Sequence, residues 1–332
     1  DYYCNLDANH LRLDYLQRPE LHKGTYDMVV PEEYWAQHPP TRINPPYVSA
    51  EPQPTGARPP APMDYVFAFD VSETSIQTGF LLDACTSLIH MLYGRPLDDG
   101  TMLEPYFPPT SRVCIITFNS SIQFYDLSSK SASMLVVGDL EEVFTPIRKG
   151  LFVNPAEAED VIKPLLESIP RRHSEFPEYS GAFIPAVRAG LAAFAGRGGH
   201  LIVFQSTLPS IGPGALPAAP QEDTLYGTAE EMSLHKPRDK LYLDVAEECI
   251  DDGVGVTLFL APNQYMDIGS VGALANVTGG DIYFHPRYEG ERDRDVMDSQ
   301  IRRTIGRFQG FNVVARVRVS NGMLWNLPVC SR

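Results

Sequence analysis

The sequence predicts an α/β protein built on a doubly wound, mostly parallel β-sheet. Two segments, 65–71 and 254–260, are almost continuously apolar, as expected of strands that are buried on both faces of a sheet. Between and beyond them, stretches with the apolar spacing of amphipathic helices alternate with shorter strand-like runs. Strands separated by helices are typical of parallel sheets, because a parallel pair needs a long crossover connection.

The composition fits a globular protein and argues against two broad classes of function. The chain has 332 residues, 43% of them hydrophobic, so it can fill a large core. Its formal charge of −15 argues against a nucleic-acid binder, whose binding surface would be basic. No run approaches the roughly 18–20 apolar residues of a membrane-spanning helix. Five scattered cysteines without a CxxC pair indicate reduced thiols rather than a disulfide framework or a zinc site.

The N-terminal part of the chain follows a different pattern. Residues 24–30 alternate well enough to predict one β-strand. Nine of the 29 prolines lie between Pro39 and Pro62, which predicts an extended surface connector over 39–62. A single strand has no core of its own, so the strand at 24–30 is expected to join a sheet built from elsewhere in the chain.

From residue 63 onward, strands and helices are expected to follow one another. After the first strand, Thr74 is the expected cap of one long helix that continues to Leu92, with Gln77 completing a capping box. Further strands are expected at 112–118, 122–127, 200–204, 254–260 and 281–284, the first two of these as a hairpin. Further helices are expected at 161–169, 185–194, 243–250, 271–274 and 295–308. The alternating segment 312–319 predicts a half-exposed strand of a different sheet.

The clearest local motif, at the end of the first strand, contains Asp70, Ser72 and Thr74. A carboxylate and two hydroxyls at alternate positions match the first part of the metal-ion-dependent adhesion site of von Willebrand A domains. That site also needs an aspartate after the strand at 200–204, where this sequence continues Phe204-Gln-Ser-Thr-Leu208. Hard cations usually require more than one carboxylate. We therefore predict no metal here, with Asp70 satisfying loop amides and the two hydroxyls capping the helix.

Signatures of catalysis are missing from the sequence. It contains no phosphate-binding loop of the G-x-x-x-x-G-K-[ST] type, no dinucleotide fingerprint after a strand, no H-E-x-x-H and no G-x-S-x-G. A hydrolase on a doubly wound sheet would need a nucleophile elbow, and a metal-dependent adhesion module would need the missing aspartate. We therefore predict an interaction scaffold rather than an enzyme.

Two arginines near the C-terminus form a candidate binding site. Arg316 and Arg318 alternate along the predicted strand, which places them on one face about 7 Å apart. Two guanidinium groups on one face suit a ligand that carries carboxylates. Without further information, an ordinary solvated strand face is the alternative interpretation.

These features together resemble one family, the cargo-adaptor subunits of the COPII inner coat. The N-terminal motifs are most similar to the subfamily that includes the fungal minor paralogue and the animal C and D forms. The resemblance covers about residues 1–322 and is carried by 4–15, 18–25, 65–72, 204–209, 263–267, 278–280 and 317–322.

The resemblance implies a domain plan. Residues 1–38 would be the exit of a zinc ribbon followed by one β-sandwich strand, and 39–62 the proline-rich connector. Residues 63–310 would form a von Willebrand A-like trunk, and 311–332 the start of the β-sandwich. The family's ribbon would lie upstream of Asp1, so no cofactor is expected in this chain, which we interpret as a truncated fragment.

The resemblance also implies a role. The family selects transmembrane cargo at the endoplasmic reticulum by binding sorting signals in cytosolic tails, and its trunk pairs with a GTPase-activating sister subunit. One cargo site of the family would fall on Arg316 and Arg318, with Arg12 and Arg18 as loose candidates for its remaining arginines. A cytoplasmic protein recruited to exit sites and COPII vesicles is implied, in peripheral contact with the membrane and without nucleic acid. The alternative function is a metal-dependent von Willebrand A-type interaction module.

Overall fold

The computed structural model describes residues 5–24, 30–35, 56–96, 101–147, 149–175, 178–217, 222–307, 309–311 and 313. The chain divides into two units, Asp1–Ala61 and Pro62–Arg332. The described part of the first unit contains three short helices, η1 (Tyr15–Gln17), α1 (Pro19–His22) and η2 (Glu32–Tyr34). Residues 25–29 of the predicted strand and most of the predicted strand 312–319 lie outside the described residues.

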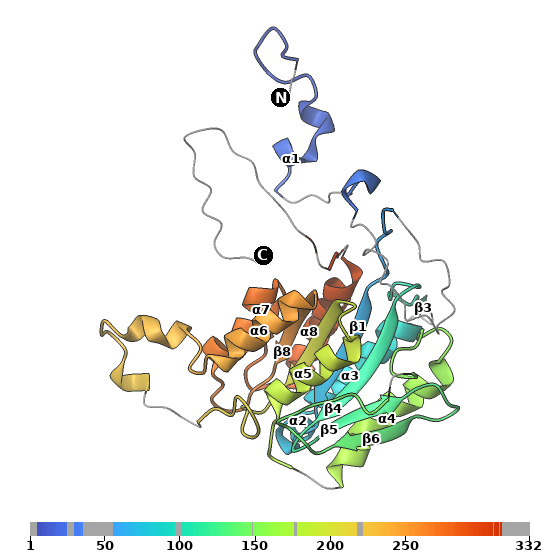
Figure 1. Cartoon of the computed structure of the whole chain (residues 1–332), viewed down its shortest axis with the longest axis vertical. Helices are drawn as coiled ribbons and strands as arrows, with labels where there is room; N and C mark the ends of the chain where they lie inside the picture. The colour runs from blue at the N-terminus through green and yellow to red at the C-terminus, as the bar shows by residue number, and fades with distance from the viewer. Residues whose placement is uncertain are drawn as a thin grey trace, which may run out of the picture. The chain divides into compact units, whose positions relative to one another are not determined.

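The second unit is built on a seven-stranded sheet with the order β6-β5-β4-β1-β7-β8-β9 (Figure 1). Strands β4, β1, β7, β8 and β9 run parallel, and β5 and β6 continue the sheet in antiparallel pairs. The predicted doubly wound sheet is therefore confirmed. The strands are β1 (Asp64–Asp70), β4 (Arg112–Phe118), β5 (Ile122–Asp126), β6 (Ser133–Val137), β7 (Gly199–Gln205), β8 (Val254–Leu260) and β9 (Ile282–Phe284); β2 (Arg95–Pro96) and β3 (Met102–Leu103) form a separate pair.

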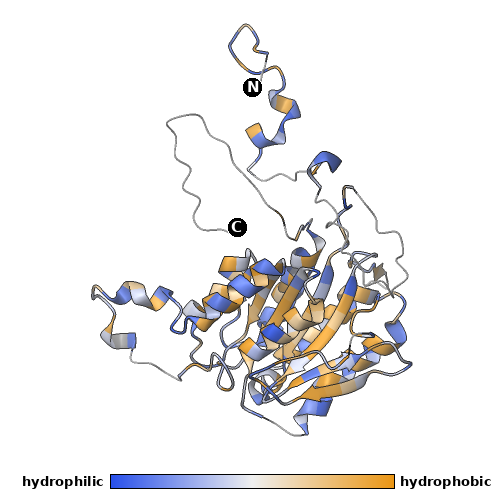
Figure 2. Cartoon of the chain, in the orientation of Figure 1, coloured by the Kyte–Doolittle hydropathy of each residue, from blue (hydrophilic) through white to orange (hydrophobic). Residues whose placement is uncertain are grey.

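Helices cover both faces of this sheet, and each face has its own hydrophobic core. The strands are predominantly apolar along their length, as Figure 2 shows, because both of their faces are buried. One face is covered by α5 (Phe183–Phe194), α6 (Leu241–Asp251) and α7 (Ile268–Thr278). The other is covered by α3 (Phe80–Tyr93), α4 (Glu159–Ser174) and α8 (Gly290–Gly306), with α2 (Glu73–Gln77) leading into α3.

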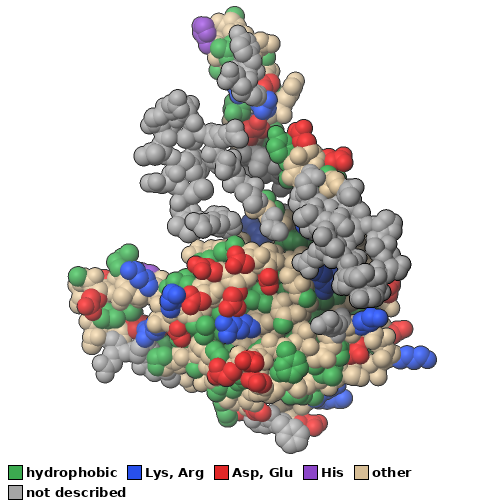
Figure 3. Space-filling model, in the orientation of Figure 1, with side chains coloured by type: hydrophobic (Ala, Val, Ile, Leu, Met, Phe, Trp, Pro, Cys, Tyr) green, Lys and Arg blue, Asp and Glu red, His purple; other side chains and the backbone are tan. Residues whose placement is uncertain are grey.

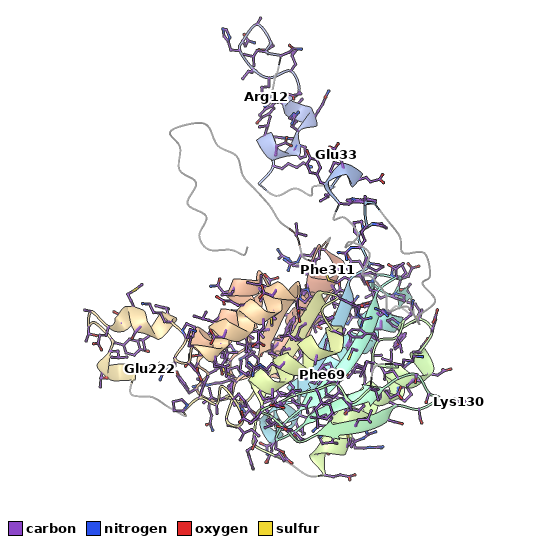
Figure 4. The ribbon with its side chains drawn as sticks, viewed as in Figure 1. Arg12, Glu33, Phe69, Lys130, Glu222 and Phe311 are labelled. Carbon is purple, nitrogen blue, oxygen red and sulfur yellow. The ribbon has the colours of Figure 1, made fainter. Side chains whose placement is uncertain are left out.

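A ladder of stacked aromatic rings crosses four neighbouring strands on the second face. Phe69, within the sheet layer in Figure 4, stacks on Phe204 with ring centroids 4.9 Å apart. Phe204 stacks on Phe259 at 5.0 Å, and Phe259 on Tyr283 at 4.7 Å. In each of these pairs, the two residues also lie opposite each other in the register of adjacent strands. The ladder thus aligns the carboxyl ends of β1 and β7, where the site described below is built.

The structure corrects several predicted elements. The single helix predicted from Thr74 to Leu92 is two helices, because Gly79 between them has a left-handed backbone with φ of 76°. Thr74 lies inside α2 and Ser72 occupies the cap position. Strand β6 was not predicted. Helix α8 begins at Gly290, before the predicted start at residue 295, and its first turn was missed because its charged side chains give no apolar period.

The remaining predicted helices and strands between residues 63 and 290 are confirmed with shifts of a few residues at their ends, whereas residues 39–55 of the predicted connector lie outside the described residues. Cys85, Cys114 and Cys249 are free thiols, as predicted, and the structure buries all three in the core. Within the ranges that the structure describes, no helix is both long and apolar enough to cross a membrane.

Candidate functional site

The candidate metal position lies at the carboxyl edge of the sheet, where β1 and β7 end side by side. The side chain of Asp70, the last residue of β1, is fully buried. Its Oδ1 accepts a hydrogen bond of 2.8 Å from the backbone N–H of Ser72. Its Oδ2 accepts two more, from the N–H groups of Ser206 at 2.8 Å and Thr207 at 2.9 Å. Asp70 therefore ties its own loop to the loop that follows β7.

A pair of hydroxyl groups closes the same position. Ser72 Oγ and Thr207 Oγ1 lie 2.6 Å apart and share a hydrogen bond. Ser72 occupies the N-cap position of α2, but its side chain makes no capping hydrogen bond. The predicted capping by Ser72 and Thr74 is therefore wrong, because Ser72 pairs across the loops instead. We call Asp70, Ser72, Ser206 and Thr207 the Asp70 hub.

The electrostatics of the Asp70 hub follow from its burial. Burial raises the pKa of the Asp70 carboxyl, while the hydrogen bonds from Ser206, Ser72 and Thr207 act in the opposite direction. The prediction that Asp70 satisfies loop amides is confirmed. A cation here would have to displace these amides and would find a single carboxylate, which is a poor donor set for a hard ion. Among the residues that the structure describes, no three His, Cys, Asp or Glu side chains gather as a metal site would require.

The structure brings two of the predicted arginines together in the first unit. Arg12 donates to both carboxylate oxygens of Asp14, from Nε at 2.9 Å and from Nη2 at 2.8 Å. Arg18 Nε donates to Asp14 Oδ2 at 2.5 Å, and its Nη1 donates to Glu20 at 3.0 Å. These hydrogen bonds from Arg12 and Arg18 hold the pKa of Asp14 well below its usual range. Arg12 and Arg18 thus converge on one carboxylate, which is the chemistry of an acidic-ligand site.

The other two predicted arginines, Arg316 and Arg318, lie outside the described residues. Two hydrogen-bonding partners, Asp14 and Thr207, were not predicted from the sequence. Asp14 could have been predicted, because an acidic residue between two arginines in the sequence indicates an ion pair. Thr207 could not have been predicted, because a single hydroxyl in a loop does not indicate which residue of another loop it will hydrogen-bond.

The fold and the hub define a class: this is a von Willebrand A-like α/β domain in which the aspartate of the adhesion motif is used inside the protein. Comparison with known proteins then identifies the family. The pattern described as "Sec23/Sec24 trunk domain" matches residues 60–305. The chain belongs to this family.

Individual relatives extend the similarity beyond the trunk. "Protein transport protein SEC24 B" of Arabidopsis thaliana is 34% identical over 328 residues, covering 97% of this chain and 27% of the relative. "Protein transport protein Sec24D" of Homo sapiens is 32% identical, covering 97% and 29%. The crystal structure of the human COPII-coat protein Sec24c aligns with a TM-score of 0.69 and 31% identity, covering 76% of this chain and 33% of that one. The chain thus spans about a third or less of the length of these proteins.

Proposed function

We propose that this protein acts as a cargo-selecting subunit of the COPII inner coat in transport from the endoplasmic reticulum to the Golgi. The observation that carries the proposal is the family match over 60–305, together with relatives that are named transport and coat proteins. The Asp70 hub supports it, because a position that could hold a metal in this fold is instead closed by internal hydrogen bonds. The protein would then act by binding rather than by catalysis, without a cofactor of its own.

Its partner would be the GTPase-activating sister subunit, and its place the cytoplasmic side of exit sites and COPII vesicles, in peripheral contact with the membrane. Co-purification of the chain with that subunit tests the pairing. We expect a stable complex, and no acceleration of GTP hydrolysis by this chain without the sister. If the chain does not co-purify with the sister subunit, the coat assignment fails; if it accelerates hydrolysis alone, the non-enzymatic assignment fails.

We assign cargo binding to Arg316 and Arg318, with Arg12 and Arg18 as secondary candidates, and acidic sorting signals as ligands. Asp14 supports the secondary pair, because its carboxylate already sits on both guanidinium groups as a ligand carboxylate would. A charge-assisted hydrogen bond contributes about 1.5–3 kcal/mol, and solvent exposure moves that contribution to the low end. Arg316→Ala or Arg318→Ala should therefore weaken an acidic tail peptide about tenfold.

The control for that experiment is Arg171→Ala, which removes an exposed arginine from α4 in the trunk. It should leave binding of the acidic peptide unchanged. Asp14→Asn should strengthen binding if Arg12 and Arg18 take part, because it removes the internal competitor. Unchanged affinity in all of these variants, with the protein folded, would exclude the arginine site.

A further inference from the structure

A projecting segment beside α6 and α7 forms a cleft that the proposed function does not use. Residues 222–240 lie between β7 and α6 and contain only two short helices, η3 (Glu222–Thr224) and η4 (Glu231–His235). We call this segment the arm; it extends away from the sheet in Figure 1. Between the arm and α7 lies an open cleft of about 670 Å³. A cleft of this size holds a few side chains of a ligand.

The floor of the cleft is apolar and partly open to solvent. Leu243, Ile268 and Ile282 line it with 38%, 39% and 38% of their surface exposed, and Tyr226 of the arm with 56%. Figure 3 shows further apolar side chains exposed on the arm. Large apolar residues exposed in one concave place indicate a binding surface rather than scattered surface hydrophobics.

The root of the arm is fixed by a polar latch. Arg238 donates to Glu222 at 2.5 Å and to the nearly buried Asp267 at 2.8 Å. Tyr265 also donates its hydroxyl to Glu222, which lies in the arm (Figure 4). Asp267 in turn caps α7 through the N–H of Ser270. The latch makes the cleft a preformed feature, and it leaves Arg238 committed to two carboxylates.

The rim that remains is acidic. Glu231 is an exposed carboxylate of the lining; exposed Glu230 lies beside it in the sequence, and the exposed Lys236 follows His235 outside the lining. Within the residues that the structure describes, neither glutamate forms an ion pair, and Glu231 accepts only a long hydrogen bond of 3.3 Å from Gly227. Among the described residues that line the cleft, His235 is the only basic one. An acidic rim above an apolar floor is complementary to a ligand that is both basic and apolar.

We infer that this cleft binds a short linear peptide segment in which lysine or arginine stands next to large apolar side chains. The apolar side chains would enter the cleft against Ile268 and Ile282, and the basic side chain would pair with Glu231. The preference is opposite in sign to that assigned to Arg316 and Arg318, so the two sites would take different ligands. The inference does not depend on the proposed coat function.

The test uses two short fluorescein-labelled peptides on the full chain, one with alternating leucine and lysine, the other with glutamate in place of each lysine. Fluorescence anisotropy should show binding of the lysine peptide, and at least about tenfold weaker binding of the glutamate peptide. Asn276→Trp places an indole in the cleft from an exposed position of α7 and should abolish binding. Glu231→Lys should weaken the lysine peptide several-fold.

Because the whole chain is acidic, the matched control must change the charge equally elsewhere. Glu167→Lys does so from an exposed position of α4, on the opposite face of the sheet, and should leave the affinity unchanged. Equal effects of Glu231→Lys and Glu167→Lys would mean attraction by net charge only and would overturn the inference. So would tight binding of both peptides, or binding that survives Asn276→Trp. Self-association that Asn276→Trp abolishes, without peptide binding, would assign the cleft to a second copy of this chain instead.

Discussion

The Asp70 hub and the arm cleft are built from similar groups and have opposite characters. In the hub, every carboxylate oxygen of Asp70 receives backbone amides from loops of the same domain, and no part of the side chain is exposed. In the cleft, the two carboxylates at the root, Glu222 and Asp267, both pair with Arg238, while Glu231 and the apolar floor face solvent. One acidic site serves the fold, and the other is available for a ligand.

This difference shows that a strand-end position suited to ligand binding can instead be used to stabilise the fold. In open α/β sheets, ligands bind outside the carboxyl ends of the strands, which is where Asp70 stands. Here the backbone amides of Ser206 and Thr207 take the place that a second carboxylate and a cation would fill. The binding site that we propose for the second unit lies instead in the arm, a segment between β7 and α6 that is not part of the sheet.

The largest effect should come from removing the hub carboxylate. Asp70→Ala leaves three N–H groups without an acceptor, two of them buried and that of Thr207 partly buried, and each unsatisfied buried group costs about 1–3 kcal/mol. After partial relaxation we expect a loss of about 3–5 kcal/mol in the free energy of unfolding, measured by urea denaturation. Asn276→Trp in the cleft should change it by less than about 0.5 kcal/mol, because that residue is exposed.

Asp70→Asn separates the loss of the acceptor from the loss of the charge. The amide keeps one oxygen acceptor but turns an N–H₂ group toward backbone donors, so we expect an intermediate loss. If Asp70→Ala is no more destabilising than Asn276→Trp, the distinction between a closed hub and an open cleft is wrong. If stoichiometric binding of magnesium or manganese is found by calorimetry and is lost in Asp70→Ala, the predicted absence of a metal is wrong.

A second buried and hydrogen-bonded side chain, His200, lies at the other end of β7 and should make the free energy of unfolding depend on pH. His200 hydrogen-bonds Gln309 at 2.8 Å and Thr257 at 2.9 Å, and burial lowers its pKa from 6.5 to about 4. Below pH 6.5 the unfolded chain takes up a proton that the folded chain does not, so the folded state loses stability as the pH falls toward 4. The shift corresponds to at most about 3 kcal/mol.

The measurement is the free energy of unfolding between pH 7 and 4, for the wild type and for His200→Gln. The variant is expected to be less stable at pH 7 but to lose the component of the pH dependence that His200 contributes. Asn276→Trp should keep the full pH dependence. An identical slope in wild type and His200→Gln would show that this histidine is not held neutral by burial.

The sequence was sufficient for most of the second unit because its signals are local. Apolar runs predicted β1, β4, β7 and β8, and the missing aspartate after Phe204 predicted that Asp70 would be satisfied internally. What sequence reasoning could not supply depends on contacts between distant residues. Ser72 and Thr207 lie 135 positions apart, and nothing in either loop indicates that their hydroxyls meet. The arm also has no strong period, so its cleft becomes visible only when α7 is placed beside it.

The smallest loss of stability is expected from removing the hydroxyl pair, and this change tests how the two loops of the Asp70 hub are joined. Ser72→Ala and Thr207→Val each remove one partner of the 2.6 Å hydrogen bond, while the amides that bind Asp70 remain. We expect each change to cost about 0.5–1.5 kcal/mol, the usual net contribution of a neutral hydrogen bond. Combined in a double-mutant cycle, they should show a coupling of about 0.5–1 kcal/mol, because the second change removes a group that has already lost its partner.

The size of that coupling decides between two structures of the hub. A coupling within experimental error of zero would mean that each hydroxyl finds another partner when the first is removed, so that the amides around Asp70 alone join the two loops. A coupling in the expected range, together with the larger loss in Asp70→Ala, would mean that backbone and side-chain hydrogen bonds close the position jointly. Since Glu231 and Asn276 share no hydrogen bond in the part of the chain that the structure describes, Glu231→Lys combined with Asn276→Trp should show additive effects on stability.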